Sequence, residues 1–277
     1  MARLLVIGLG EVGSALYSIA VNSGRFEVYG YDLDPRKTAN RLEEVPKPVD
    51  FLHFCVPYLS KDRFLGALRE YVERFKPSLV LIHSTVAPGT TRLVYEALEV
   101  PIAYTPVRGK HPNLKPHMLF WPKWVATLPA EALEEATQHL RELGLKAKAY
   151  AGPPETLELA KLVETVYRAL MIAWWQEVHR MSRKFGAELK AVAEFVGEVH
   201  EVLGDRPVYY PGVIGGHCLI PNTEILRSVY PSKMLDAILE SNELRVREVE
   251  DPEVVKEVEE VKRVAERFLN KDYFAGK

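Results

Sequence analysis

The stretch Arg3-Leu-Leu-Val-Ile-Gly-Leu-Gly-Glu-Val-Gly13 decides the fold of this chain. Its apolar run predicts a buried strand, and three glycines with the spacing Gly-x-Gly-x-x-Gly follow at Gly8, Gly10 and Gly13. In a strand–turn–helix unit, the first glycine permits a tight turn, the second lets a pyrophosphate approach the backbone, and the third allows close helix packing. The start of the helix adds free N–H groups and a partial positive charge. The stretch therefore predicts a dinucleotide site.

Asp32 ends the next predicted strand, where a carboxylate binds the adenosine ribose hydroxyls and repels a 2′-phosphate. NAD is therefore the expected cofactor, while Arg36 nearby leaves NADP open. The alternative is a similar glycine turn that binds no cofactor. Further candidate cofactor contacts lie at the helix start and at the ends of the third and fourth strands: Glu11, Val12, Val56, Pro57, Ser84 and Thr85.

The first half of the chain alternates between strand and helix patterns, which predicts an α/β fold with a Rossmann-like, doubly wound parallel sheet. The predicted strands are Arg3–Gly8, Phe26–Asp32, Phe51–Val56, Ser78–His83, Val100–Tyr104, Trp124–Leu128 and a last one near Lys146–Ala151. The predicted helices include Lys61–Phe75, Thr90–Leu98 and Ala130–Leu143. Gly152-Pro153-Pro154 ends the pattern, so we expect an NAD-binding domain over 1–152.

The rest of the chain, 153–277, has helical patterns throughout and predicts an all-α dimerisation and substrate domain. Its predicted helices are Glu155–Phe185, Glu188–Leu203, one near Lys233–Arg247 and the strongly charged Glu253–Leu269. The first of these is long and apolar nearly all round. Such helices are buried, often between subunits, so we expect a homodimer.

Composition excludes several classes of protein. The 277 residues carry a formal net charge of −2, which gives no sign of nucleic-acid binding. No apolar run reaches the roughly 20 residues of a membrane helix, and Glu11 interrupts the short N-terminal run that resembles a signal peptide. Two cysteines in unlike surroundings favour a reducing, cytoplasmic compartment. Gln138 and Gln176 are the only glutamines among many charged residues, which is typical of a thermophile.

Cys218 lies in the glycine-rich stretch Pro211-Gly-Val-Ile-Gly-Gly-His-Cys-Leu-Ile-Pro-Asn222, whereas Cys55 lies in an apolar strand. Gly215 and Gly216 leave bare backbone beside the thiol, so a ligand can approach closely. A thiol on such a loop, in a chain with a nicotinamide site, suggests oxidation through a covalent sulfur adduct. The alternative is a small residue packed in a turn. No metal site is predicted, because His217-Cys218 lacks the usual ligand spacing.

Several motifs occur in the order found in the UDP-glucose/GDP-mannose dehydrogenase family, which the chain resembles from residue 1 to about Arg247. They are Gly8–Gly13, Asp32, His83-Ser-Thr-Val-Ala-Pro-Gly-Thr-Thr91, Glu158-Leu-Ala-Lys161 and Gly215-Gly-His-Cys218. The resemblance implies an NAD-binding domain, a long dimer-forming helix and a nucleotide-sugar domain. It also implies oxidation of a sugar alcohol to a carboxylate with two NAD and a cysteine-bound thioester.

Through this resemblance, Cys218 is the expected nucleophile, Lys161 stabilises the developing alkoxide, and Thr85 lies near the reacting centre. The residues alone leave an alternative for each: an ion pair of Lys161 with Glu158 or Glu164, and a turn capped by Thr85.

The chain also departs from the family. Thr165 replaces an asparagine, Asn222 an aspartate and Val107 a glutamate, and the sequence stops at Lys277, where the nucleotide-sugar domain is expected. Thr165 and Asn222 stay in the candidate catalytic set.

Two other functions remain open. A β-hydroxyacid dehydrogenase-like enzyme shares the two-domain plan and a helix lysine, and it needs no cysteine. A non-catalytic, NAD-binding regulatory or assembly subunit fits the altered residues. The basic residues Arg108, Lys110 and His111 follow the fifth strand and either bind an acidic substrate or form a solvated loop.

Overall fold

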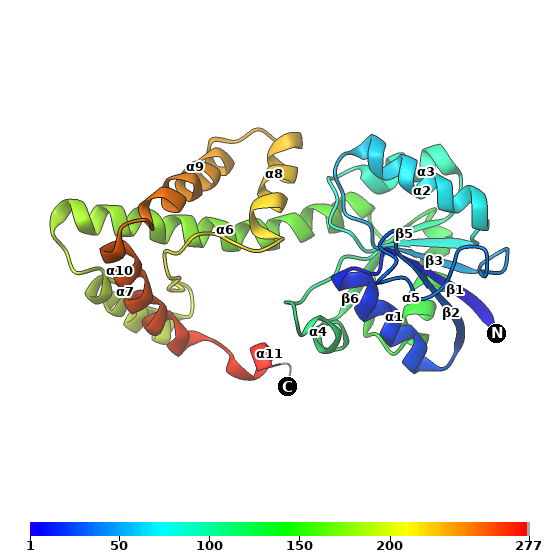
Figure 1. Ribbon diagram of the computed structural model, residues 1–277, viewed down its shortest axis with the longest axis horizontal. Helices are drawn as coiled ribbons and strands as arrows, with labels where there is room; N and C mark the ends of the chain where they lie inside the picture. The colour runs from blue at the N-terminus through cyan, green and yellow to red at the C-terminus, as the bar shows by residue number, and fades with distance from the viewer. Residues whose placement is uncertain (276–277) are drawn as a thin grey trace. The chain divides into compact units, whose positions relative to one another are not determined.

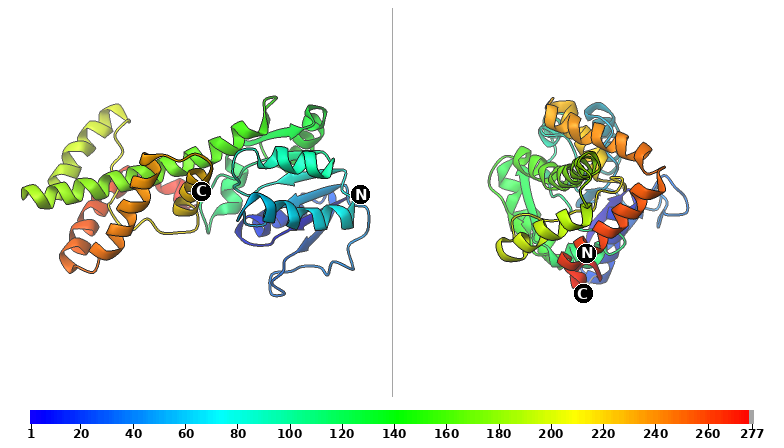
Figure 2. Two further views of the ribbon diagram at one scale, coloured as in Figure 1. Left: turned by 90° about the horizontal axis from the view of Figure 1, so that it is seen from above. Right: turned by 90° about the vertical axis from the view of Figure 1, so that its left-hand side faces the viewer.

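A computed structural model describes residues 1–275, which form two compact units (Figures 1 and 2). The first comprises Met1–Lys161 together with the residues from Asp272 onward, and the second comprises Leu162–Lys271. No helix among the described residues has the length and hydropathy needed to cross a bilayer.

The first unit is built on a seven-stranded sheet in the order β2-β1-β3-β4-β5-β6-β7 (Figure 1). The strands are β1 (Ala2–Ile7), β2 (Phe26–Tyr31), β3 (Phe51–Phe54), β4 (Leu79–Ile82), β5 (Ile102–Tyr104), β6 (Lys123–Leu128) and β7 (Ala147–Ala149). All neighbours pair in parallel except β5 and β6. The predicted doubly wound sheet is confirmed. β6 is reversed because the segment after β5 returns to the sheet from the same edge, whereas a parallel strand needs a crossover.

Helices cover both faces of this sheet, because alternate strand residues point to opposite sides. The helices of the first unit are α1 (Glu11–Ser23), α2 (Lys61–Phe75), α3 (Thr90–Leu98), α4 (Leu114–Phe120), α5 (Leu133–Glu142) and the short α11 (Lys271–Ala275) at the unit boundary. On one face, Leu4 and Val6 pack with α1, α4 and α5. On the other, Leu5 and Ile7 pack with α2 and α3.

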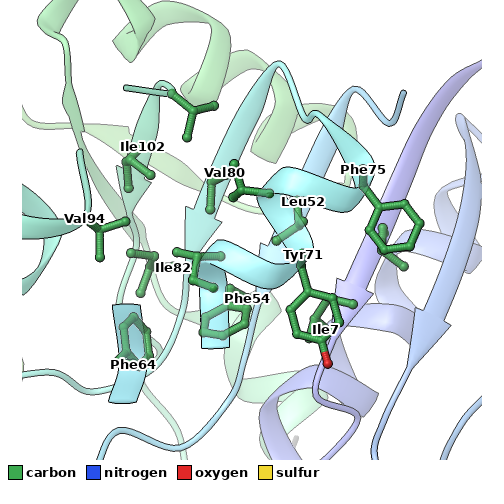
Figure 3. Close-up of a cluster of buried hydrophobic side chains, with 14 of the residues drawn as sticks. Ile7, Leu52, Phe54, Phe64, Tyr71, Phe75, Val80, Ile82, Val94 and Ile102 are labelled. Carbon is green, nitrogen blue, oxygen red and sulfur yellow. The ribbon is translucent and has the colours of Figure 1, made fainter. Parts of the chain in front are cut away.

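Figure 3 shows the second of these cores. Phe64, Tyr71 and Phe75 of α2 lie over Leu52 and Phe54, from the centre of the sheet. Full burial of one such side chain contributes about 1.5–3 kcal/mol. The core therefore holds the strand ends, and the loops that follow them, in a fixed arrangement.

The second unit is entirely helical. Its helices are α6 (Pro154–Phe185, whose first turns belong to the first unit), α7 (Leu189–Leu203), α8 (Leu219–Val229), α9 (Lys233–Glu248) and α10 (Pro252–Ala265). Trp175 of α6 packs with α7 and α10 in one cluster, and Ala169 of α6 packs with Ile238 of α9 in another. α6 is thus the common element of both clusters.

Three details differ from the sequence-based expectations. Helices α4 and α8 were not predicted, because both are short and follow loops rich in proline or glycine. The predicted helix Glu253–Leu269 ends earlier, at Ala265, and a 3₁₀ turn follows. Finally, α6 is not buried all round within this chain, because Val163, Tyr167 and Trp174 are 50–54% exposed.

Candidate cofactor and active site

The glycine turn after β1 has the geometry of a dinucleotide site. Gly8 has φ of +86°, which only glycine adopts without strain. A Cβ on Gly13 would lie 1.7 Å from the carbonyl oxygen of Gly8, whereas a Cβ on Gly10 would have no neighbour within 4 Å. Gly8 and Gly13 are therefore required by the fold, and Gly10 leaves open space before the N-terminus of α1, where phosphates bind.

Asp32 follows β2 and is held beside this turn. Its Oδ2 accepts a hydrogen bond from the N–H of Leu9 at 2.7 Å, and its Oδ1 accepts one from the N–H of Asp34 at 2.8 Å. Arg36 donates to Asp34 through Nε at 3.0 Å and through Nη2 at 2.9 Å, which lowers the pKa of Asp34. The carboxylate of Asp34 therefore balances the charge of Arg36, the arginine that could otherwise bind the 2′-phosphate of NADP.

The other predicted cofactor contacts lie at the carboxyl edge of the sheet, where open α/β sheets bind ligands. They are Glu11 and Val12 in the first turn of α1, Val56 and Pro57 after β3, and Ser84 and Thr85 after β4. Ser84 Oγ donates to the carbonyl oxygen of Val56 at 2.6 Å, which joins the two loops. The structure brings these six residues to the same edge.

Lys123 is a buried lysine at this edge that sequence reasoning missed. Because β6 is antiparallel to β5, its first residue lies where β5 ends. Lys123 Nζ donates to the carbonyl oxygens of Thr105 and Pro106 at 2.6 and 2.9 Å. Burial lowers its pKa to about 7, which the neighbouring Cys55 opposes. A lysine at the start of an otherwise apolar strand was the available signal.

Cys55, by contrast, has no features of a reactive thiol. It follows β3 and packs against the core on the α1 and α5 side of the sheet. Burial raises the pKa of its thiol to about 12, against a smaller opposing effect of Lys123. Since the thiolate is the nucleophilic form, Cys55 is inert at neutral pH.

The segment between β5 and β6 is held against the protein on both sides. The guanidinium of Arg108 lies 4.9 Å from the ring centre of Trp121 and donates to the carbonyl oxygen of Pro122 at 2.5 Å. His111 Nδ1 is 3.8 Å from Glu11 Oε1, in the first turn of α1. His111 therefore lies beside the first turn of α1, whereas Arg108 contacts the other end of the segment.

His117 on α4 holds the segment between β5 and β6 through a hydrogen bond to Lys110. It is buried, and its Nδ1 accepts the N–H of Lys110 at 2.9 Å, so its Nε2 carries the proton. Nε2 donates to the carbonyl oxygen of Tyr273 at 2.7 Å, and the two rings stack 4.2 Å apart. Gly109 has φ of +149°, and a Cβ there would lie 2.8 Å from His117.

Glu158, in the first turns of α6, has a structural role that was not predicted. It is fully buried and accepts hydrogen bonds from the N–H of Gly89 at 2.6 Å, and from the N–H and Oγ1 of Thr91 at 2.8 and 2.6 Å. Burial raises its pKa, and these bonds oppose that effect. Its carboxylate lies at the N-terminus of α3, where negative charge is favourable.

Cys218 lies in the second unit, immediately before α8, and its side chain is exposed. Gly216 beside it has φ of +83° and open space around it, as expected for a loop that a ligand approaches. The loop is anchored on both sides. Gln176 of α6 donates to the carbonyl oxygen of Gly212 at 2.8 Å, and Asn242 of α9 accepts the N–H of Ile214 at 2.7 Å.

The remaining catalytic candidates divide between the units. Lys161 belongs to the first, with Thr85, and Thr165 and Asn222 belong to the second, with Cys218. Thr165 and Asn222 are each 5% exposed. Val107, which replaces the family glutamate, packs into the core on the α1 face. Among the described residues, no cluster of histidine, cysteine, aspartate and glutamate has the geometry to hold a metal ion.

Comparison with known proteins finds similarity to the same family. Residues 155–244 match the model of the UDP-glucose/GDP-mannose dehydrogenase family, central domain. UDP-N-acetyl-D-mannosamine dehydrogenase from Methanocaldococcus jannaschii is 24% identical over 311 residues, covering 97% of this chain and 70% of the relative. The chain thus spans about two thirds of the length of such relatives.

Solved structures agree with this fold. UDP-D-ManNAc dehydrogenase from Pyrococcus horikoshii superposes with a TM-score of 0.75 at 22% identity, covering 87% of this chain and 68% of the other. The 3-hydroxyisobutyrate dehydrogenase of Mycobacterium tuberculosis superposes with a TM-score of 0.66 at 13% identity, covering 95% of this chain and 99% of the other. The chain is thus similar to proteins of the UDP-glucose/GDP-mannose dehydrogenase family, and residues 155–244 match the central domain of that family.

Proposed function

We propose that this chain is an NAD-dependent dehydrogenase that oxidises a carbinol, with a nucleotide sugar as the first substrate class to test. The observation that carries the proposal is the glycine turn with Asp32 bonded to it through Leu9. That geometry offers open space for a pyrophosphate and a carboxylate for a ribose. NAD is favoured over NADP because Arg36 is engaged by Asp34.

The proposed chemistry depends on Cys218 and Lys161. The cofactor supplies the hydride acceptor. Loss of a hydride from the carbinol carbon and of the hydroxyl proton gives an aldehyde, and the ammonium of Lys161 stabilises the negative charge that develops on the substrate oxygen. The thiol of Cys218 then adds to the aldehyde, with the thiol proton passing to the carbonyl oxygen. Loss of a second hydride and a proton from this thiohemiacetal gives a thioester. Water hydrolyses the thioester to the acid and regenerates the thiol, so each substrate consumes two NAD.

A homodimer is part of the proposal. Within the second unit, α6, α7 and the loop before Pro207 line an apolar groove that contains Trp174, Met181 and Phe185. These three side chains are 39–74% exposed in the single chain. Exposed apolar surface of this kind marks an interaction site. Trp174→Glu is expected to convert a dimer into a monomer in sedimentation experiments, and an unchanged sedimentation coefficient would contradict this placement.

The decisive experiment counts NADH formed per substrate consumed, with NAD and a panel of UDP-sugars, GDP-sugars and small hydroxyacids. Two NADH per nucleotide sugar are expected, and Cys218→Ala is expected to abolish acid formation. An unchanged product with Cys218→Ala would remove the covalent step.

A β-hydroxyacid dehydrogenase-like activity is the second candidate. It is favoured by one observation: the superposition covers 99% of the M. tuberculosis 3-hydroxyisobutyrate dehydrogenase. One NADH per hydroxyacid, insensitive to thiol alkylation, would establish this alternative.

A cofactor-binding regulatory or assembly subunit is the third candidate. It is motivated by the departures at Val107, Thr165 and Asn222. It predicts bound NAD without turnover of any substrate in the panel.

A further inference from the structure

Three histidines form a continuous row through the interior of the first unit. His53 of β3 lies between the other two, with its Nδ1 2.8 Å from Nε2 of His83 and its Nε2 2.7 Å from Nε2 of His139 on α5. The three residues are 0–2% exposed. The rings of His53 and His83 are nearly parallel, at 12° and 5.1 Å, and that of His139 stacks on Phe51 at 3.7 Å.

The row runs from one edge of the sheet toward the other. His83 directly follows β4, beside Ser84 at the carboxyl edge where the cofactor contacts gather. At the opposite end, the ring of His139 covers Phe51, the first residue of β3. Phe51 is partly buried, and the edge of the buried Phe26 ring also contacts His139, with ring centres 4.9 Å apart.

The two hydrogen bonds within the row do not by themselves fix which ring donates in each. A neutral imidazole has one N–H and one lone pair, so each ring donates to one neighbour and accepts from the other. Two arrangements are therefore available, in which the donors all point one way or all point the other. Nδ1 of His83 and Nδ1 of His139, the two ends, are buried without a hydrogen-bond partner among the described residues. The backbone of Thr105 lies near enough to His83 to raise the pKa of that ring, although no hydrogen bond of ordinary geometry is formed, so it biases the row without fixing it.

The charges around the row keep it neutral. Burial lowers the pKa of His53 and of His83, and the positive charge of Lys123 lowers both further, while the backbone of Thr105 opposes this effect at His83. Burial alone lowers the pKa of His139 to about 3. Cys55, which faces the same layer, has its pKa raised to about 12 by burial, so it remains a neutral thiol. No positive charge is therefore stored on the three rings at neutral pH.

Lys123 is the ionisable group near the His83 end. It bonds to the carbonyl oxygen of Thr105, whose own N–H donates to the carbonyl oxygen of Ile82, directly before His83. Burial lowers the pKa of Lys123 to about 7; Cys55 opposes this effect, and Lys161 and Arg108 add to it. A group that titrates near neutral pH at the ligand edge is suited to exchange protons there.

We propose that His83, His53 and His139 form a proton relay between the carboxyl edge of the sheet and its amino edge. A proton that arrives at Nδ1 of His83 allows the Nε2 proton of His83 to pass to Nδ1 of His53. The Nε2 proton of His53 then passes to Nε2 of His139, which releases its Nδ1 proton. One proton enters and one leaves, and all hydrogen bonds are reversed. The role rests on the proposed dehydrogenase function, because carbinol oxidation releases one proton with each hydride.

Nitrogen-15 NMR of the histidine side chains tests the relay without any substrate. A relay requires both arrangements, so each nitrogen of His53 is expected to show a shift averaged between protonated and unprotonated values. His179 is the reference within the same spectrum. Its Nδ1 accepts from Arg245, which only donates, so its proton is fixed on Nε2 toward Glu257. A single fixed tautomer at His53, like that of His179, would overturn the relay.

His53→Gln provides the kinetic test and assigns the resonance. Glutamine keeps one donor and one acceptor in the row, but an amide cannot pass a proton from one atom to the other. The variant is expected to fold, to keep its affinity for NAD, to lose about tenfold in turnover, and to show a larger solvent isotope effect. His179→Gln, a buried histidine outside the row, is expected to retain wild-type turnover.

An unchanged turnover and solvent isotope effect in His53→Gln would remove the relay from the mechanism. If the wild-type chain turns over no substrate, the proposed function fails. The NMR result still decides whether protons move along the row.

Discussion

Gly13 lies so close to Gly8 that a Cβ on Gly13 would stand 1.7 Å from the carbonyl oxygen of Gly8. Gly10, between them in the sequence, would meet nothing within 4 Å. The glycines of this motif are thus required for two different reasons, one for folding and one for ligand binding. Gly13 is a condition of folding, because helix α1 could not approach the turn after β1 with a larger residue. Gly10 matters only when a ligand occupies the space before the helix.

Substitution by alanine separates these requirements. Gly13→Ala is expected to destabilise the protein by about 3 kcal/mol or more, since backbone must move to admit the methyl group. Gly10→Ala is expected to leave the stability within about 0.5 kcal/mol and to weaken NAD binding by about tenfold or more. Urea denaturation and calorimetric titration measure the two effects. Wild-type NAD affinity in Gly10→Ala would mean that the open space is not the cofactor site.

Asp32 is expected to determine which cofactor binds. Its carboxylate lies beside the glycine turn through the N–H of Leu9, and it would repel a 2′-phosphate. Asp32→Asn keeps an acceptor for that bond but removes the charge. We therefore expect weaker NAD binding and a smaller preference for NAD over NADP, read from the two dissociation constants. Glu43→Gln is the control, because Glu43 pairs with Arg74 and contacts neither the turn nor Arg36. An equal effect of both variants would contradict the assignment.

The two cysteines are expected to differ in reactivity. Cys218 is exposed in a glycine loop, whereas Cys55 is only partly exposed and burial raises the pKa of its thiol to about 12. Iodoacetamide at pH 8 is expected to modify only Cys218 in the folded protein, and both residues in urea. Peptide mass spectrometry locates the adduct. Modification of Cys55 at a similar rate in the folded state would show that its burial is not maintained in solution.

Much of the sheet could be predicted from the sequence, because its signals are local. The glycine spacing and the apolar strand before Gly8 are contained in eleven consecutive residues, Arg3–Gly13. The direction of β6 could not be predicted, because it depends on the path of the chain between two strands and not on the strand residues. Lys123 was missed for the same reason, since only the reversed strand brings it to the carboxyl edge.

The histidine row is a clearer case of a contact that the local sequence cannot predict. His53 and His83 are 30 residues apart in the sequence, and His53 and His139 are 86 apart. In the sequence His53 and His83 are single histidines within apolar strands, and His139 is one residue of an amphipathic helix, so none of them stands out from an ordinary core residue. Only the packing of α5 on β3 reveals the contact. The catalytic roles of Cys218 and Lys161, in contrast, were suggested by their motifs and remain predictions for kinetic experiments.

Lys123 gives the final prediction, a pH dependence of stability. The pKa of Lys123 is about 7 in the folded chain, against an ordinary value of 10.5, because burial disfavours the ammonium. Between these values the unfolded chain binds more protons than the folded one, so the contribution of Lys123 to stability rises with pH over this window. Lys123→Met removes this titration. The wild type is therefore expected to gain stability relative to Lys123→Met as the pH rises from 7 to 9, by up to about 1.4 kcal/mol per pH unit. This range stays at or below the ordinary pKa of 9.0 for the neighbouring Cys55 thiol.

Urea denaturation at the two pH values measures the change, with Lys148→Met in β7, where the lysine is exposed, as the control. A stability difference between wild type and Lys123→Met that is the same at both pH values would mean that Lys123 is solvated and titrates normally. In that case it could not serve as the proton-exchanging group at the His83 end of the row.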